Sequence, residues 1–230
     1  VSPGVIITGG VNVWKSTDYG VNWNCIGHWY GDQGVPYVHA DIHFLGFSPH
    51  NTSVVFAGCD GGVFKSPDNG QSWSDLSTGL GITQIYKMGN DVNAPNRLIC
   101  GTQDNGTNRL INGAWVQVLG GDGMDCLISP VNGNQMYGSY YYGSLYRSDD
   151  GGNNFQDISY QILEEEAGDW VTPFMISPAD NTSLFAGFNN LCKSFEIGNN
   201  WSRVIVFFQC NLYYINCIAI APSNANYMYI

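Results

Sequence analysis

A ten-residue motif that occurs four times constrains the fold of this chain more than any other feature. Each copy starts with an aromatic residue or Cys, continues as Lys/Arg-Ser-x-Asp/Glu-x-Gly, and ends with Trp or Phe after two further residues. The copies are WKSTDYGVNW at 14–23, FKSPDNGQSW at 64–73, YRSDDGGNNF at 146–155 and CKSFEIGNNW at 192–201. A fifth repeat lacks the Ser-x-Asp core and keeps only the closing aromatic, Trp115. Successive closing aromatics are 40 to 50 residues apart, so the chain repeats one structural unit.

A second element precedes most of these motifs and indicates that the repeated unit is built from strands. It is a short apolar run, a Ser/Pro/Asn turn and a second run rich in β-branched or aromatic residues. The copies are FSPHNTSVVFAG at 47–58, ISPVNGNQMYG at 128–138, ISPADNTSLFAG at 176–187 and APSNANYMYI at 221–230. Pro and Gly interrupt nearly every helical window, and only residues 160–167 are expected to form a helical turn.

The repeat length and the strand pattern together predict an all-β fold, a β-propeller of four-stranded antiparallel blades with five recognisable repeats. We expect residues 1–230 to form one propeller domain or a fragment of one. The five repeats either close into a five-bladed ring or form an arc of a larger propeller.

The four motifs resemble Asp-box repeats, also called bacterial neuraminidase repeats, which occur in sialidases, xyloglucanase-type glycosidases and sortilin-type receptors. The resemblance covers essentially the whole chain, with boxes at 16–23, 66–73, 148–155 and 194–201, the last degenerate because Glu196 replaces Asp. HADIH (39–43), GCDGGVFKS (58–66), GTQDNGT (101–107) and GGDGM (120–124) resemble secreted bacterial Asp-box proteins described as glycosyl-hydrolase-like. We transfer no catalytic role, because xyloglucanase-type enzymes work in a cleft between two propellers and this chain has one at most.

The residues of the boxes are expected to serve folding. An Asp carboxylate can accept backbone N–H bonds within the turn, Gly can adopt a positive φ at low cost, and the aromatic can pack between blades. The positions are Ser16, Asp18, Gly20 and Trp23; Ser66, Asp68, Gly70 and Trp73; Ser148, Asp150, Gly152 and Phe155; and Ser194, Glu196, Gly198 and Trp201. We expect Glu196, with its longer side chain, to cap its turn less well.

The remaining polar motifs fall in loops opposite the boxes, where successive blades converge on one face, the usual place for a site in such a fold. The expected binding residues are His39, Asp41, His43, Asp60, Asp104, Asn105, Asp122, Tyr141, Tyr142 and Asp169. The candidate catalytic acids are Asp41, Asp60, Asp104, Asp122 and Asp125.

Three functions compete for this face. We favour recognition of a glycan, another surface polymer or a protein; the first alternative is a glycoside hydrolase that uses two of the acids, and the second is a purely structural module. A sialidase is disfavoured, because only four arginines are present and two of them belong to or follow a box. No cofactor is expected, although His39, Asp41 and His43 alternate and would share one side of a strand, where they could hold a divalent cation.

Charge and composition narrow the partners and the location. Nineteen acidic and eight basic residues give a net charge of −11, which repels nucleic acid and anionic membranes. No apolar stretch approaches the length of a membrane span. Sequons start at Asn51, Asn105, Asn181 and Asn200, and we expect a secreted or cell-surface protein that binds carbohydrate or an extracellular protein.

The seven cysteines allow two interpretations. Cys59–Cys100 and Cys210–Cys217 are the favoured pairs if the compartment is oxidising. Alternatively, all seven are small apolar residues with free thiols.

Overall fold

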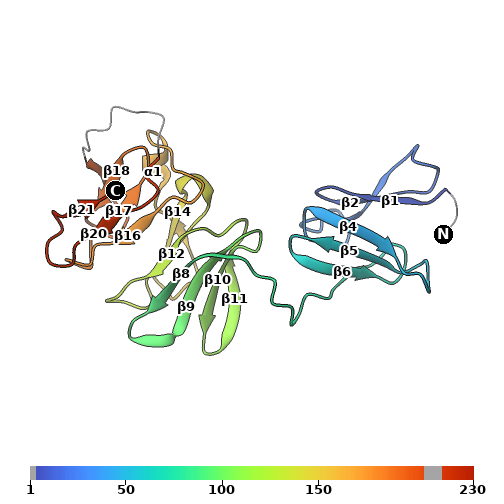
Figure 1. Cartoon of the computed structure of the whole chain (residues 1–230), viewed down its shortest axis with the longest axis horizontal. Coiled ribbons are helices and arrows are strands. Elements are labelled where there is room, and N and C mark those ends of the chain that lie inside the picture. Colours follow the sequence, from blue (N-terminus) through green and yellow to red (C-terminus); the bar gives the residue numbers. More distant parts are fainter. Residues whose placement is uncertain (1–3, 205–213) are drawn as a thin grey trace. The chain divides into compact units, whose positions relative to one another are not determined.

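The computed structural model describes residues 4–204 and 214–230. The chain divides into two compact units, Val1–Ile82 and Thr83–Ile230, and each is described by itself. Within both units the described strands pair in antiparallel meanders (Figure 1). The predicted all-β fold is therefore confirmed. The number of blades in a complete ring and the single-domain organisation stay predictions.

The first unit contains two sheets. The three-stranded sheet has the order β1 (Ile6–Gly9), β2 (Val13–Ser16), β3 (Asn24–Gly27). The four-stranded sheet has the order β4 (Ile42–Phe47), β5 (Val55–Cys59), β6 (Gly62–Ser66), β7 (Ser74–Asp75). Val13, Val38, Ala57 and Phe64 form the buried cluster of this unit.

The second unit contains three four-stranded sheets and a terminal hairpin. The first sheet joins β8 (Ile85–Asp91), β9 (Ala94–Thr102), β10 (Thr107–Ile111) and β11 (Ala114–Leu119). The next joins β12 (Cys126–Ile128), β13 (Met136–Ser139), β14 (Leu145–Ser148) and β15 (Gln156–Asp157). The third joins β16 (Phe174–Ile176), β17 (Leu184–Gly187), β18 (Leu191–Ser194) and β19 (Trp201–Val204), and the hairpin joins β20 (Ala219–Ile220) to β21 (Met228–Tyr229).

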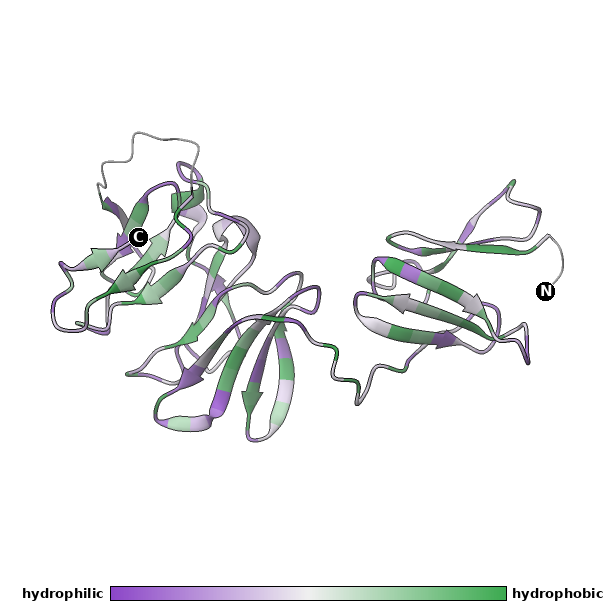
Figure 2. Ribbon diagram, viewed as in Figure 1, coloured by the Kyte–Doolittle hydropathy of each residue, from purple (hydrophilic) through white to green (hydrophobic). Residues whose placement is uncertain are grey.

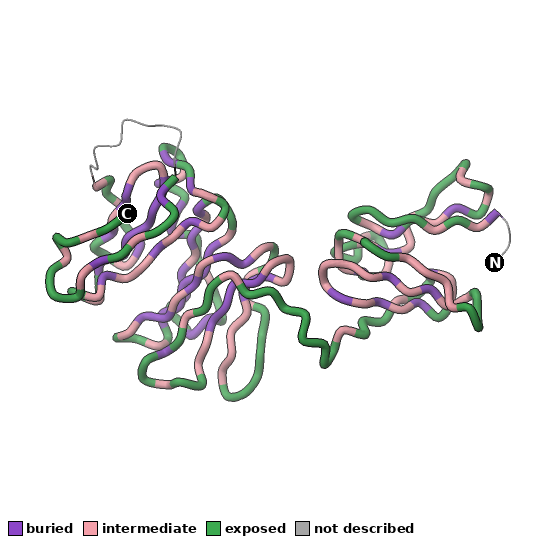
Figure 3. The backbone as a smooth tube through the Cα atoms, viewed as in Figure 1, coloured by how far each residue is buried: buried purple, intermediate pink, exposed green. Residues whose placement is uncertain are grey.

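The strands of the second unit differ in how far their residues are buried. All residues of β13 and β17 are buried, whereas four of the six residues of β11 are exposed (Figure 3). Hydrophobic residues mark the buried strands, as along β17 (Figure 2). Backbones of neighbouring sheets approach closely at Gly101, where an added Cβ would collide with the carbonyl oxygen of Met124. The sheets thus pack face to face with no room for larger side chains at this point.

Helical structure is confined to two short segments of the second unit among the described residues. The α-helix α1 (Tyr160–Leu163) occupies the start of the segment for which a helical turn was expected. The 3₁₀ turn η1 (Tyr141–Gly143) joins β13 to β14 and contains Tyr142 at φ 61°. Both segments lie in loops opposite the boxes.

Each Asp box forms a tight hydrogen-bonded turn between two strands. In the box that follows β6, the Ser66 hydroxyl donates to Asp68 Oδ1 at 2.9 Å and accepts the Gly70 N–H at 2.7 Å. Asp68 also accepts the Ser72 N–H at 2.8 Å. These bonds to the ionised carboxylate lower the pKa of Asp68, and the equivalent bonds hold the pKa of Asp18 at about 2. The carboxylate is therefore a structural acceptor.

The box at 194–201 contains fewer of these bonds. Ser194 Oγ still accepts the Gly198 N–H at 2.9 Å, and Asn200 Nδ2 donates to Glu196 Oε2 at 2.6 Å. Among the described bonds, the Glu196 carboxylate accepts no backbone N–H, whereas the Asp150 carboxylate accepts those of Asn153 and Asn154. The extra methylene of Glu displaces its carboxylate from the turn.

The closing aromatics join a box to the sheet before it in two cases. Trp73 Nε1 donates to the Ile26 carbonyl at 2.7 Å, and Trp201 Nε1 donates to the Ile158 carbonyl at 2.7 Å. Trp23 differs, because its Nε1 donates to Gly20 of its own box at 3.0 Å. Trp23 belongs to the first described sheet along the chain, so no earlier described sheet is available to it.

Within each unit, the cysteines in the described residues carry free thiols. Cys59 lies in the first unit and Cys100, only 3% exposed, in the second, so the Cys59–Cys100 pair stays a prediction. Burial raises the pKa of the Cys126 thiol to about 12. The proposed Cys210–Cys217 pair involves Cys210, which lies outside the described residues.

Candidate functional site

The predicted binding residues are distributed over both units, in loops at the sheet edges opposite the boxes. Residues 39–43 precede or begin β4, and Asp60 lies in the β5–β6 turn. In the second unit, Asp104 and Asn105 lie in the β9–β10 turn, and Asp122 and Asp125 lie between β11 and β12. Tyr141 and Tyr142 form η1, and Asp169 lies between α1 and β16.

In the first unit, one side-chain hydrogen bond joins two of the predicted site residues. His43 Nε2 lies 2.6 Å from Asp60 Oδ1. The His39 ring packs so tightly over Gly61 that an added Cβ at Gly61 would overlap it. The His43–Asp60 pair ties the start of β4 to the β5–β6 turn.

The alternation that suggested a metal site is not present in the backbone. Strand β4 begins only at Ile42, and Asp41 has φ 61°, which interrupts an extended chain. Within the described residues, no three His, Cys, Asp or Glu side chains are grouped so that they could hold a metal ion. The cation remains a hypothesis from sequence.

In the second unit, Gln103 organises the acidic loops. Its Nε2 donates to Asp104 Oδ1 at 2.8 Å and to Asp122 Oδ1 at 3.0 Å. The Asp104 N–H also donates to Asp122 Oδ1 at 2.8 Å, and Asp104 has φ 58°. One amide thus bonds to both predicted carboxylates, which come from different loops.

Three aromatic side chains form an exposed group in the same unit. The rings of Tyr141 and Trp170 are stacked, with centroids 5.1 Å apart and planes 4° from parallel, and the Tyr142 ring meets Trp170 edge-on at 5.5 Å. They are 42% (Tyr141), 36% (Trp170) and 56% (Tyr142) exposed. We call these three residues the aromatic platform.

Hydrogen bonds connect the aromatic platform to the acidic loops. Trp170 Nε1 donates to the Tyr86 hydroxyl at 3.2 Å, and that hydroxyl donates to Gln103 Oε1. Asp169 bonds to the backbone of two platform residues. Its Oδ1 accepts the Trp170 N–H at 2.7 Å, and its carbonyl accepts the Tyr142 N–H at 3.2 Å. The platform, Tyr86, Gln103, Asp104 and Asp122 therefore form one continuous group.

Asp125 differs from the other predicted acids. Burial raises its pKa to about 6, although the Lys87 charge and the N–H groups of Cys126 and Phe174 act in the opposite direction. Lys87 belongs to β8, Cys126 to β12 and Phe174 to β16. Asp125 thus lies where the first strands of three successive sheets meet, and it titrates near neutral pH.

Sequence reasoning did not identify Tyr86, Gln103 or Trp170. Tyr86 belongs to strand β8 and to no motif, whereas Gln103 lies in the GTQDNGT motif (101–107), beside the predicted residues Asp104 and Asn105. Trp170 directly follows Asp169, so an exposed aromatic next to a predicted site acid was the available signal.

The sequon asparagines occupy different environments. Asn51 and Asn200 are exposed, whereas Asn105 and Asn181 are half-buried. Asn105 donates through Nδ2 to the Gln103 carbonyl at 3.1 Å, and Thr107 of its sequon is fully buried. Asn51 and Asn200 are therefore the two exposed acceptors.

The described fold and loops define this chain as a protein built of propeller-type blades. No sequence-family model matches it, and no curated protein matches it in sequence. In structure it is similar to a GH74 enzyme of Niastella koreensis, with 18% identity and a TM-score of 0.48, over 99% of this chain and 39% of that one. It is also similar to YCF48 from Cyanidioschyzon merolae, with 14% identity and a TM-score of 0.38, over 86% of this chain and 68% of that one.

A third similar structure is an auxiliary nutrient binding protein from Bacteroides thetaiotaomicron, with 14% identity and a TM-score of 0.35, over 66% of this chain and 37% of that one. The chain spans well under half the length of the GH74 enzymes, 30% to 39%. Within the described residues, no helix has the length and apolar character needed to cross a membrane.

Proposed function

We propose that this protein recognises a glycan through the aromatic platform and the adjoining acidic loops of the second unit. The observation that supports this most is the hydrogen-bonded chain Trp170–Tyr86–Gln103, which joins exposed aromatic rings to Asp104 and Asp122. Aromatic rings present a flat apolar surface, and sugar rings have an apolar face of similar size. Carboxylates and amides beside such a surface can accept and donate hydrogen bonds to sugar hydroxyls.

The arrangement is also preorganised for binding. Tyr141, Tyr142 and Trp170 already contact one another, and Asp169 fixes the backbone on both sides. Little side-chain entropy is therefore lost when a ligand binds. An acidic, preorganised aromatic surface suits a neutral oligosaccharide better than an acidic one.

Calorimetric titration with a panel of neutral oligosaccharides tests the proposal. We expect Trp170→Ala to weaken binding at least about tenfold, because the platform loses its central ring. Trp115→Ala is the matched control, since Trp115 is 53% exposed on β11 and belongs to no part of the platform. Unchanged affinity of Trp170→Ala, or no binding of any neutral oligosaccharide, would contradict glycan recognition at this site.

A glycoside hydrolase is the second candidate, and the raised pKa of Asp125 favours it. A retaining or inverting enzyme needs one protonated and one ionised carboxyl group. Asp125, with a pKa of about 6, could donate a proton, and Asp104 or Asp122 could supply the second carboxyl group. Measuring turnover of the same panel distinguishes an enzyme from a binding module. The variants to test are Asp41→Asn, Asp60→Asn, Asp104→Asn, Asp122→Asn and Asp125→Asn. Loss at two positions indicates an enzyme, and binding without turnover indicates a recognition module.

The proposed location is secreted or cell-surface. The acidic net charge of −11 and the exposed Asn51 sequon support this. Carbohydrate or an extracellular protein remains the proposed partner.

A further inference from the structure

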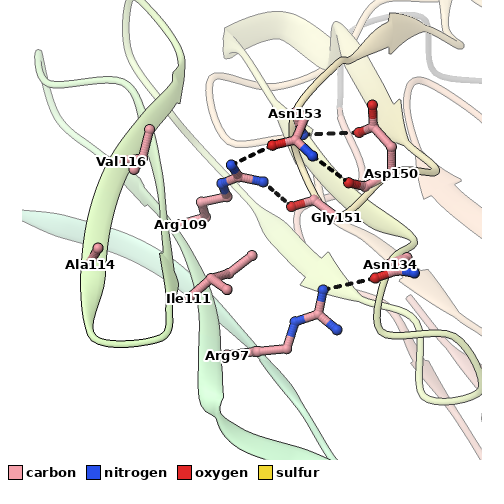
Figure 4. A pocket seen from close by; sticks show the side chains of 9 residues that line it. All are labelled: Arg97, Arg109, Ile111, Ala114, Val116, Asn134, Asp150, Gly151 and Asn153. Carbon is pink, nitrogen blue, oxygen red and sulfur yellow. Dashed lines mark hydrogen bonds between the residues drawn. The ribbon is translucent and has the colours of Figure 1, made fainter.

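A cavity of about 360 Å³ lies on the box side of the second unit, on the opposite sheet edge from the aromatic platform. Figure 4 shows its two arginines, Arg97 and Arg109, between an apolar wall on one side and the box at 148–155 on the other. The complete lining is Arg97, Arg109, Ile111, Ala114, Val116, Asn134, Asp150, Gly151 and Asn153. Its volume is at the small end of the range for ligand pockets, about 300 to 1,000 Å³.

Arg109 docks on the next box in a way that the protein uses elsewhere. Its Nη1 donates to the Gly151 carbonyl, and its Nη2 donates to Asn153 Oδ1 at 2.7 Å (Figure 4). One sheet further along, Arg147 Nη1 donates to the Ile197 carbonyl at 3.0 Å and to Asn199 Oδ1 at 2.9 Å. Ile197 and Asn199 occupy the same box positions as Gly151 and Asn153.

The two arginines differ in their negative partner. Arg147 Nη2 lies 3.0 Å from the carboxylate of Asp149, two residues further along the chain. The residue two positions after Arg109 is Ile111, because this repeat lacks the Ser-x-Asp core. Among the described residues, no carboxylate forms an ion pair with Arg109. Beside Arg147, the carboxylate of Asp149 lies next to the guanidinium. Beside Arg109, the cavity occupies the corresponding position.

Arg97 adds a second guanidinium to the same cavity. Its Nη2 donates to Asn134 Oδ1 at 3.0 Å, and its Nη1 lies 3.6 Å from Asp91 Oδ2. The Nε atoms of both Arg97 and Arg109 are buried and have no hydrogen-bond partner within the described part of the chain. Because a guanidinium carries five N–H donors, both side chains also retain N–H groups beyond the bonds described, which an oxyanion could satisfy.

The box at 148–155 differs from the other boxes at the position beside Arg97. The residue before the box Gly is Tyr19, Asn69 or Ile197 in the other boxes, and Gly151 in this one, all with positive φ. An added Cβ at Gly151 would lie 3.2 Å from Arg97 Nη2. Glycine at this position therefore leaves room for the second arginine.

The acid that lines the cavity is already engaged. Asp150 Oδ1 accepts the Ser148 hydroxyl at 2.8 Å and the N–H groups of Asn153 and Asn154 at 2.9 and 3.0 Å. Its Oδ2 accepts Asn154 Nδ2 at 2.7 Å. The hydrogen bonds occupy both carboxylate oxygens, and they hold the pKa of Asp150 far below the usual range.

We propose that this cavity binds a hexuronic acid, whose carboxylate pairs with Arg109 and Arg97 as Asp149 pairs with Arg147. The ring lies against Ile111, Ala114 and Val116, and its hydroxyls meet the amides of Asn134 and Asn153. The volume fits one sugar, and the guanidinium fork matches a planar carboxylate. The site is separate from the aromatic platform and does not depend on the function proposed for it.

Calorimetry with glucuronate and glucose as the paired probes tests this site, because the two sugars differ only in the carboxylate. We expect glucuronate to bind and glucose to show no measurable binding. Ile111→Asp supplies an internal carboxylate where Asp149 stands in the next repeat, so it should weaken glucuronate binding at least about tenfold. Ile111→Asn is the matched control for lost packing, and it should retain most of the affinity.

A second pair of variants covers the case in which substitution of Ile111 prevents folding. Val116 is 46% exposed on β11, so Val116→Glu and Val116→Gln should both fold. Val116→Glu places a charge at the cavity and should abolish glucuronate binding, whereas Val116→Gln should not. Equal binding of glucose and glucuronate, equal binding of inorganic sulfate, or equal affinities of the Glu and Gln variants would each overturn the proposal.

Discussion

Arg109 and Arg147 make the same two contacts with the box of the next repeat, yet only Arg147 is neutralised by the protein itself. Arg147 is buried, at 6% exposure, and pairs with Asp149. Arg109 has the same docking geometry but faces a cavity with Arg97. The two arginines therefore share one feature and differ in another. Both link one sheet to the next box, but only Arg147 has a carboxylate partner within the protein.

A third example shows that the link is general. In the first unit, Lys15 Nζ donates to the Asn69 carbonyl at 3.0 Å, and Asn69 occupies the box position of Gly151 and Ile197. In three repeats, a basic residue therefore joins one sheet to the box of the next. Four predictions follow from this comparison, in order of decreasing effect.

Arg147→Met should have the largest effect on stability. It removes the bonds to Ile197 and Asn199 and leaves Asp149 without its cation. We expect the free energy of unfolding to fall by about 3 kcal/mol, because two hydrogen bonds of a buried guanidinium are lost, while Asp149 itself is 48% exposed. Urea denaturation followed by tryptophan fluorescence measures it. A loss no greater than that of Arg109→Met would show that the ion pair with Asp149 contributes nothing.

The two boxes on which these arginines dock should differ in their dependence on serine. Ser148 donates to Asp150 and accepts the Gly152 N–H at 2.8 Å, whereas Ser194 accepts the equivalent N–H but donates to no acid among the described bonds. We expect Ser148→Ala to cost about 2 kcal/mol and Ser194→Ala about 1 kcal/mol, because a buried N–H is left unpaired in both. Urea denaturation measures both losses. Equal losses of unfolding free energy would mean that the bond from Ser148 to Asp150 does not contribute to stability.

Arg109→Met should destabilise the second unit less than Arg147→Met. It removes two hydrogen bonds to the box but leaves no carboxylate unpaired. We expect a loss of about 1 kcal/mol, together with loss of glucuronate binding. Lys193→Met is the control for one lost positive charge, since Lys193 lies over the rings of Phe185 and Phe195. A large loss of stability with unchanged glucuronate affinity would make Arg109 purely structural.

The sequence predicted the strands and boxes well because they depend on local rules. Alternating apolar runs, turn residues and the Ser-x-Asp-x-Gly spacing act within a few residues, so the all-β fold could be inferred without coordinates. The same spacing did not indicate the partner of each closing aromatic: Trp73 and Trp201 reach the preceding sheet, whereas Trp23 bonds to its own box. That choice depends on packing between sheets, which a local motif does not encode.

The candidate sites were less predictable because they depend on which loops meet. Topology placed Asp104, Asp122, Tyr141 and Tyr142 at one edge, but the residue that connects the acids is Gln103, an unremarkable amide. The basic position of the motif was visible in the sequence, while its contact with the next box depends on the distance between sheets. The arginine cavity arises from the repeat without a Ser-x-Asp core, so a departure from the pattern was its only sequence signal.

Glu196→Asp is the smallest and most specific test, because it restores the regular acid to the box on which Arg147 docks. The shorter side chain should accept the Asn200 N–H, as Asp150 accepts that of Asn154 at 3.0 Å, and it should accept the Ser194 hydroxyl. We expect a gain of about 0.5 kcal/mol in the free energy of unfolding, since the new bonds replace bonds to water. Asp150→Glu is the reciprocal change and should lower stability in the box on which Arg109 docks. If Glu196→Asp destabilises the protein instead, the box has adapted to the longer acid, with its bond from Asn200 to Glu196 at 2.6 Å as the favoured contact.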